Sequence, residues 1–269
     1  MPLPKASLPK NATRANKSLH DGLKCLQWIL TQRGATSLQD LAKALGFETT
    51  RVHRLLKTFV QAGFLRQTSG RKYEPGPAVF YMAMHTLHES HLLQAALPPL
   101  ERLRRMAKQS VAMGVYWNRT VSYLYHAAPS MPIEQAIGGC GLYPASNSGI
   151  GLMVLAQMTD DELREIYDDG KVDDMEGGIG QLFETLEEIR GRGYAYISLK
   201  PWVTHTLAIP MKSNPTMSVA VAGKITEDEV PQFLPLLRQT VDEIEAALHP
   251  GEQPGALESL KLRRQRGLI

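Results

Sequence analysis

The stretch TTRVHRLLKTFVQAGFL at residues 49–65 decides the fold of the first third of the chain. Its apolar residues recur every three or four positions, which predicts a helix over residues 49–61 with one buried stripe, closed by Gly63. The stripe consists of Val52, Leu55, Leu56, Phe59 and Val60. The other side of this helix is hydroxylic and basic.

Two helices are predicted before this stretch. The first begins near Ser18 and ends at Gly34, and four leucines at spacings of four, three and four form its apolar stripe. These are Leu19, Leu23, Leu26 and Leu30. The second helix is short: Ser37 caps its first turn, Asp40 reaches back toward the cap, and Gly46 provides a left-handed end.

A tight turn leads into the third helix, which Thr49 or Thr50 is expected to cap. Two short strands then follow at residues 64–66 and 72–74, around a loop rich in turn residues. Short helices joined by a tight turn, followed by a hairpin, are typical of a winged helix-turn-helix. The alternative is an ordinary three-helix bundle with a basic, solvated face.

The charge is divided unevenly along the chain. Residues 1–80 contain 13 Lys and Arg against 4 Asp and Glu, a net charge of +9, whereas residues 81–269 contain 17 against 23, a net charge of −6. A basic first third suggests that only this end meets a polyanion.

These features resemble the IclR family of bacterial regulators. The likeness is strongest at residues 49–65 and at YEPG, residues 73–76, and it extends over residues 17–248. The resemblance implies an α+β protein with a winged helix-turn-helix domain and a GAF-like effector-binding domain with an antiparallel sheet. The predicted DNA-binding residues are Thr49, Thr50, Arg51, His53, Arg54, Lys57, Arg71 and Lys72.

The side-chain chemistry suits DNA. Arginine pairs bidentately with guanine in the major groove, while hydroxyls and lysines hold phosphates. Two residues keep an alternative: His53 could orient a neighbour or contact a phosphate, and Arg54 could pair with another residue of its own helix. A basic wing, including Arg66, could touch phosphates.

The predicted organisation has five parts: a disordered arm at 1–16, the winged domain at 17–76, a linker helix at 77–93, the effector-binding domain at 94–249 and a basic tail at 250–269. His85, His88 and His91 recur every three residues in the linker, but no acidic or cysteine partner completes a ligand set, so no metal is expected.

The effector-binding domain contains a glycine-rich segment at 144–156. By resemblance, this loop and helix start present backbone N–H groups to an acidic ligand; the alternative is a turn needed only for packing. The predicted effector residues are Ser146, Asn147, Ser148, Gly149, Trp202, His205 and Thr206.

Several positions depart from the family pattern. Leu152 stands where the family commonly has Lys, Thr206 where it has Cys, and Ala220 and Ala222 where it has Ser. An aromatic and apolar stretch at 196–202 replaces an acidic one. The departures favour a pocket for a ring-bearing or amphipathic acid, and they also fit a weakened or empty sensor.

Motifs of common enzymes are missing from the sequence: it has no GxSxG, no HExxH and no phosphate-loop or dinucleotide fingerprint. Cys140 has no recognisable base beside it. With two cysteines, no signal peptide and no apolar run of about 20 residues, a cytoplasmic protein outside the membrane is expected.

The sequence therefore predicts a regulator without enzymatic activity or cofactor. We expect a homodimer or homotetramer that binds a double-stranded DNA operator and a small-molecule effector. Repression or activation depends on where the operator lies relative to a promoter. The alternative is a cytoplasmic small-molecule-binding or thiol-dependent enzyme with a basic N-terminal extension.

Overall fold

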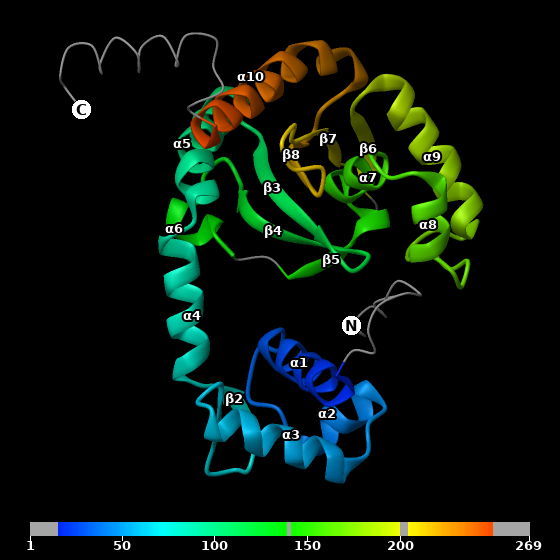
Figure 1. The fold of residues 1–269 in the computed structure, drawn as a ribbon. Coiled ribbons are helices and arrows are strands. Elements are labelled where there is room, and N and C mark those ends of the chain that lie inside the picture. Colours follow the sequence, from blue (N-terminus) through cyan, green and yellow to red (C-terminus); the bar gives the residue numbers. More distant parts are fainter. Residues whose placement is uncertain (1–15, 139–140, 200–203, 250–269) are drawn as a thin grey trace, which may run out of the picture. The chain divides into compact units, whose positions relative to one another are not determined.

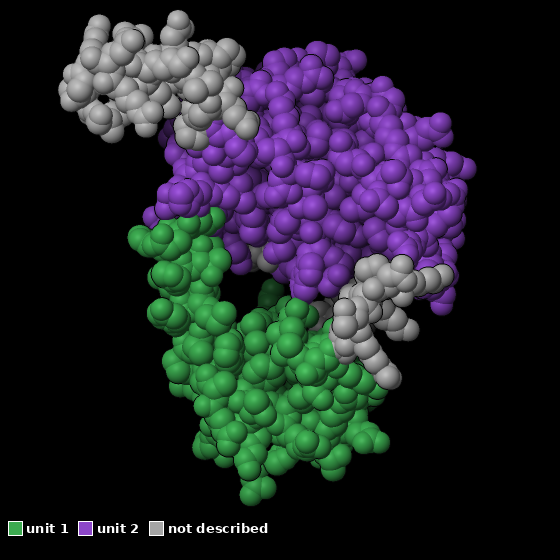
Figure 2. Space-filling model, viewed as in Figure 1, with its two compact units in different colours: residues 1–90 green, residues 91–269 purple. Residues whose placement is uncertain are grey.

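The computed structural model describes residues 16–138, 141–199 and 204–249. The chain divides into two compact units, which we call the N-terminal unit, residues 1–90, and the C-terminal unit, residues 91–269 (Figure 2). The predicted basic tail, Cys140 and Trp202 lie outside the described residues.

The N-terminal unit contains a three-helix bundle, a hairpin and a final helix (Figure 1). The elements are α1 (Lys17–Leu30), α2 (Leu38–Leu45), α3 (Thr49–Gln61), β1 (Leu65–Gln67), β2 (Tyr73–Pro75) and α4 (Pro77–His88). Strands β1 and β2 pair antiparallel, and Tyr73 also exchanges backbone hydrogen bonds with Thr36. The fully buried side chains of Leu41, Val52 and Leu56 bring the three helices together.

The sequence predicted the boundaries of these helices better than their caps. Gly46 ends α2 in the left-handed conformation, at φ +65°, as predicted. Ser37 caps α2, but the carboxylate of Asp40 accepts a hydrogen bond from the Ser37 hydroxyl, so the reciprocal half of the capping box is missing. The predicted threonine cap of α3 is wrong, because Glu48 occupies the cap position without a side-chain hydrogen bond.

The predicted apolar stripe of α1 is largely exposed. Leu19, Leu23 and Leu30 face solvent within the chain, and the helix buries Cys25 and Ile29 instead. Leu26 belongs to both stripes. Both sets of residues have helical spacing, so periodicity alone could not decide which side meets α3.

The linker helix is shorter than predicted. α4 ends at His88, and the next helix, α5, begins at His91 and runs to Ala107. The sequence predicts this next helix from Leu97 to about Lys108, so the prediction misses the start of α5 and not its end. Leu93 and Ala96, which precede the prolines at 98 and 99, are both buried, and this packing holds the chain helical through them.

The C-terminal unit is built on one six-stranded antiparallel sheet with helices on both faces (Figure 1), and this confirms the predicted α+β class. Its strand order is β5-β4-β3-β8-β7-β6. The strands are β3 (Ser110–Trp117), β4 (Thr120–Ala127), β5 (Leu142–Pro144), β6 (Ala195–Leu199), β7 (Thr204–Pro210) and β8 (Met217–Gly223). The helices after α5 are α6 (Ile133–Ala136), η1 (Ala145–Asn147), α7 (Gly149–Leu155), α8 (Asp160–Ile166), α9 (Gly178–Arg192), η2 (Glu227–Glu229) and α10 (Val230–Leu248).

Each face of the sheet has its own core. Helices α5 and α10 pack together over one face, which we call the α10 face, with Val111, Leu207 and Val219 among its buried residues. Helix α7 packs on the other face, the α7 face, where Ala208 and Ala220 are buried. Neighbouring residues of one strand therefore belong to different cores.

A polar cluster ties α5 to β4. The hydroxyl of the fully buried Tyr125 donates to Glu101 at 2.6 Å, and the guanidinium of Arg104 donates to the same carboxylate at 2.6 Å. Burial acts to raise the pKa of Glu101, but the hydrogen bonds from Arg104 and Tyr125 outweigh it and hold that pKa below its usual value. Glu101 therefore stabilises the fold in its charged form.

We predict that Tyr125→Phe destabilises the chain by about 1.5–3 kcal/mol at neutral pH, since the hydrogen bond that it removes is to a charged group. Because the pKa of Glu101 is lower in the folded chain, the charged carboxylate stabilises the fold at every pH above the usual pKa of 4.5. This stabilisation is lost as the pH falls through the lowered pKa of the folded state. The difference in the free energy of unfolding between Tyr125→Phe and the native chain, measured by urea titration, should therefore become smaller as the pH falls below 4.5. Tyr196→Phe, which removes a hydrogen bond to the carbonyl of Ile225, is the control and should show no such acid dependence. An equal destabilisation of Tyr125→Phe at every pH would contradict the role of Glu101.

Candidate nucleic-acid interface and ligand site

The outer side of α3 is exposed and positively charged. Val52 and Leu56 are fully buried and fix the rotation of the helix. With 3.6 residues per turn, Thr50, Arg54 and Lys57 then point away from the core. All three are exposed, and α3 itself contains no acidic residue. This side of α3 can approach a polyanion along its whole length.

Thr49 and His53 lie on one flank of the outer side and are also exposed. Within the described part of the chain, His53, Arg54 and Lys57 form no ion pair, so the intrahelical partner considered for Arg54 is not seen. The hydroxyl of Thr58 donates to the carbonyl of Arg54 at 3.1 Å and leaves the guanidinium untouched.

Arg51 lies on the opposite flank and is directed inward. It forms an ion pair with Asp21 of α1, and its guanidinium lies 5.5 Å from the centre of the Phe47 ring. The buried Cys25 is close to this pair: burial, and then the negative charge of Asp21, raise the pKa of its thiol to about 11. Among the basic residues of α3, Arg51 thus differs in having an acidic partner within the described residues.

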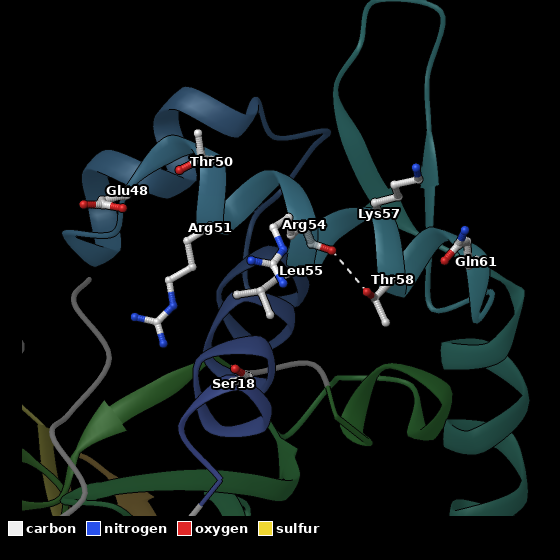
Figure 3. A pocket seen from close by; sticks show the side chains of 9 residues that line it. All are labelled: Ser18, Glu48, Thr50, Arg51, Arg54, Leu55, Lys57, Thr58 and Gln61. Atoms are coloured by element: carbon white, nitrogen blue, oxygen red, sulfur yellow. Dashed lines mark hydrogen bonds between the residues drawn. The ribbon is translucent and has the colours of Figure 1, made fainter.

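A surface hollow runs along the side of α3 that adjoins the start of α1 (Figure 3). Its lining includes Ser18 from α1 and the cationic side chains Arg51, Arg54 and Lys57 from α3. In Figure 3, Arg51 points toward the side of α1, whereas Thr50 points the other way. The hollow is polar and open, which suits a charged backbone better than an apolar ligand.

The wing supplies two more exposed cations. Arg71 and Lys72 lie in the turn between β1 and β2, and Arg71 has a positive φ of 57°. Arg66, in contrast, forms an ion pair across the hairpin, with its Nε 2.7 Å from a carboxylate oxygen of Glu74. The wing therefore presents Arg71 and Lys72 at its tip.

The first two residues predicted for the effector site form hydrogen bonds with the loop at residues 173–174. The hydroxyl of Ser146 donates to the carbonyl of Asp173 at 2.6 Å, and the amide of Asn147 donates to the carboxylate of Asp174 at 2.8 Å. These contacts hold residues 173–174 against the turn that precedes α7. Both side chains have a structural role in this arrangement.

Three of the predicted residues do come together on the α7 face. Ser148 caps α7, is almost fully buried and shares a hydrogen bond of 3.0 Å with the hydroxyl of Tyr123. Gly149 packs directly on Thr206, whose methyl group would lie 2.5 Å from a Cβ at Gly149. The hydroxyl of Thr206 is buried without a hydrogen-bond partner among the described residues. It can therefore still donate or accept a hydrogen bond.

His205 lies on the other side of the sheet. It precedes Thr206 on β7, and alternation turns it to the α10 face, where its ring stacks on Tyr196 with the centroids 5.1 Å apart. The predicted set therefore does not form one site: the α7 face keeps Ser148, Gly149 and Thr206.

Sequence reasoning missed an aromatic group on β4 and β5. The ring of Tyr123 meets His126 and Tyr143 edge to face, with centroids 5.6 Å and 5.4 Å apart. Burial lowers the pKa of His126, which favours its neutral, uncharged ring. Strand alternation could have paired Tyr123 with His126 only if the β-bulge between them had been foreseen.

Small side chains separate this aromatic group from Thr206. His126 pairs across the sheet with Ala112, which in turn pairs with Ala220, and Thr206 pairs with Ala222. On the α7 face, a row of alanines therefore lies between Thr206 and His126, and two of them, Ala112 and Ala220, are buried in the core beneath α7.

Two further observations limit the chemistry of the described residues. No three His, Cys, Asp or Glu side chains in this part of the chain come together as a metal site. None of its helices is long and apolar enough to cross a membrane.

Comparison with known proteins covers both units. A family model for the IclR helix-turn-helix domain matches residues 18–69, and one for the bacterial transcriptional regulator IclR C-terminal domain matches residues 84–246. The chain is 25% identical to the transcriptional repressor IclR of Escherichia coli (strain K12) over 256 residues, which is 88% of this chain and 91% of the repressor.

Solved structures share the fold. An IclR family transcriptional regulator from Brucella abortus superposes with a TM-score of 0.75 at 22% identity, covering 90% of this chain and 96% of that one. An IclR homolog complexed with 4-hydroxybenzoate, from Microbacterium hydrocarbonoxydans, has a TM-score of 0.66 at 19% identity, covering 87% and 100%.

We predict that Gly149→Ala destabilises the chain by about 1–3 kcal/mol, because its Cβ would overlap the Thr206 methyl group. Combining it with Thr206→Ser, which removes that methyl, should restore part of the stability in urea unfolding. Gly180→Ala is the matched control, since a Cβ there meets nothing within 4 Å. If Gly149→Ala were as stable as the native chain, the close approach of α7 to β7 would be refuted.

Proposed function

Because the chain belongs to the IclR family of bacterial transcriptional regulators, we propose that its N-terminal unit binds a double-stranded DNA operator and its C-terminal unit a small organic acid. Its relatives are named as transcriptional repressors, and the chain is a regulator and not an enzyme. The alternative of a thiol-dependent enzyme is therefore wrong. We place the regulator in the cytoplasm, where its operator is.

The observation that carries this proposal is the exposed, cationic outer side of α3. Its fixed rotation directs Arg54, Lys57 and Thr50 outward together. In a major groove, Arg54 is suited to a bidentate pair with guanine, while Lys57 and the threonine hydroxyls are suited to phosphates. His53, on the flank, is within reach of a phosphate or a base edge.

The wing extends the same surface. Arg71 and Lys72 at its tip carry two charges that no ion pair within the described residues neutralises. We assign them to backbone phosphates beside the groove that α3 enters. Contacts of this kind add affinity without sequence preference.

The regulator acts as a homodimer or homotetramer in this proposal. No residue of α4 is buried within the chain, although the helix is largely apolar. Its exposed large side chains are Phe80, Tyr81, Met82, Met84 and Leu87. A contiguous apolar surface of this kind marks a protein interface, and a second copy would bring two α3 helices onto half-sites about one helical turn apart.

The effector site we propose lies on the α7 face between Thr206 and His126. Its polar ends are the Thr206 hydroxyl, which has no hydrogen-bond partner among the described residues, and the His126 ring beside Tyr123. Of the alanines between them, Ala112 and Ala220 are buried beneath α7 and fill little space. Such a site suits a flat, ring-bearing acid better than a two-carbon acid. The homolog from Microbacterium hydrocarbonoxydans is complexed with 4-hydroxybenzoate, which makes that acid the first ligand to test.

Ligand binding would favour one arrangement of the paired winged units. Coupling free energies between sites are commonly about 1–3 kcal/mol, which shifts affinity by about 5- to 150-fold. The sign of the shift, and so repression or activation, depends on the operator.

For DNA binding, we predict that Arg54→Ala weakens binding to duplexes selected from a randomised pool by about 1–3 kcal/mol and relaxes their sequence preference, because the variant cannot pair with a base edge. A double change, Arg71→Ala with Lys72→Ala, should weaken all duplexes alike and reduce the slope of log K against log salt by about 0.9 for each phosphate that is no longer neutralised. Fluorescence anisotropy titrations at several salt concentrations measure both effects.

Arg238→Ala removes the same charge from an exposed position on α10 and serves as the control. It should leave affinity and slope unchanged. Absence of any selected duplex for the native chain would refute DNA binding, and an Arg54→Ala variant that retains full specificity would refute the assignment of base reading.

For the effector, we predict that 4-hydroxybenzoate and related ring-bearing acids raise the thermal midpoint of the chain, while glyoxylate does not. Thr206→Val keeps the shape of the side chain, removes the hydroxyl and should reduce the ligand-induced rise. Thr240→Val, which alters a buried threonine of α10, is the control and should keep it. A preference for glyoxylate would contradict the ring-bearing ligand.

A further inference from the structure

We infer that Arg51 serves DNA recognition as a positioning residue: it fixes α3 against α1 through Asp21 and does not touch DNA. This inference rests on the proposed DNA binding of α3. It divides the basic residues of that helix into two groups with different tasks: Arg54 and Lys57, which have no ion pair within the described residues, and Arg51, which is paired with Asp21.

Burial is the first argument. Asp21 is only 5% exposed, and its carboxylate contacts the guanidinium of Arg51. A carboxylate taken out of water needs a charged or hydrogen-bonding partner, and removing that partner is much more costly than breaking a pair at the surface. Moving Arg51 to a DNA phosphate would leave Asp21 without its ion pair.

The surroundings of Arg51 provide the second argument. Its side chain is 34% exposed, and the guanidinium lies over the Phe47 ring while it contacts Asp21. A planar guanidinium can pair with a carboxylate at its edge and stack on a ring with its face at the same time. These contacts fix the side chain on the flank of α3.

The place of the pair along the helix is the third argument. Arg51 is in the first turn of α3, and the preceding Glu48 supplies no side-chain cap. The ion pair therefore joins the start of α3 to α1, one residue from Thr50 and one turn from Arg54. Small rotations of this turn would change which base edges Arg54 can reach.

Three variants test the inference on duplexes selected by the native chain. Asp21→Asn keeps the size of the side chain and removes its charge, Arg51→Met removes the cation, and Asp21→Leu with Arg51→Met replaces the pair by apolar side chains. We expect each single change to lower the ratio of specific to non-specific affinity by about tenfold, because interaction energies between contacting residues are commonly of that size. The double change should restore most of it, because no unpaired charge remains buried.

The salt dependence separates positioning from a direct phosphate contact. For a positioning residue, the slope of log K against log salt stays at the native value in all three variants. If Arg51 bound a phosphate, the slope would fall by about 0.9 in both variants that lack it, and Asp21→Asn would bind as well as the native chain or better. That result would overturn the inference.

A purely structural effect gives another pattern. It would lower the thermal midpoint and reduce specific and non-specific binding by the same factor, and an unchanged ratio in the folded Asp21→Asn variant would therefore also overturn the inference. Failure of the native chain to select any duplex is a different outcome, since it refutes the DNA binding on which the inference rests.

Discussion

The burial of one side of α3 is the constraint on which the DNA-binding surface depends. Val52 and Leu56 have no freedom to turn outward, because the core of the N-terminal unit closes around them. Every other residue of the helix then takes its direction from helical geometry. The packing of the apolar side alone therefore sets the direction of the exposed basic side chains. They lie on one side of α3 without forming contacts of their own.

The parts of this fold that depend on local pattern were predictable, and the parts that depend on partners were not. The bounds of α3 and the hairpin follow from periodicity and turn residues within a few positions of each other in the chain. The inward direction of Arg51 depends on Asp21, which is 30 residues away and whose burial only the packed structure reveals. The buried side of α1 is unpredictable for the same reason.

The effector side shows a similar division. Ser148 is predicted from the likeness of the segment around α7 to the family pattern and Thr206 from a departure from that pattern, and the structure places both on the α7 face. His205 is wrongly grouped with them, since it is adjacent to Thr206 on one strand and so faces the opposite core. The two ends of the proposed site come from β4 and β7, with β3 and β8 between them, and only the strand order brings them onto one face of the sheet.

The burial of Cys25 has a consequence for the chemistry of the living cell. A thiol with a pKa of about 11 is ionised in roughly one molecule in ten thousand at pH 7, and peroxides and disulfides react with the thiolate. Cys25, in the core of the N-terminal unit, is therefore expected to react slowly with oxidants. A change in the redox state of the surroundings should therefore leave the packing around Cys25 unaltered.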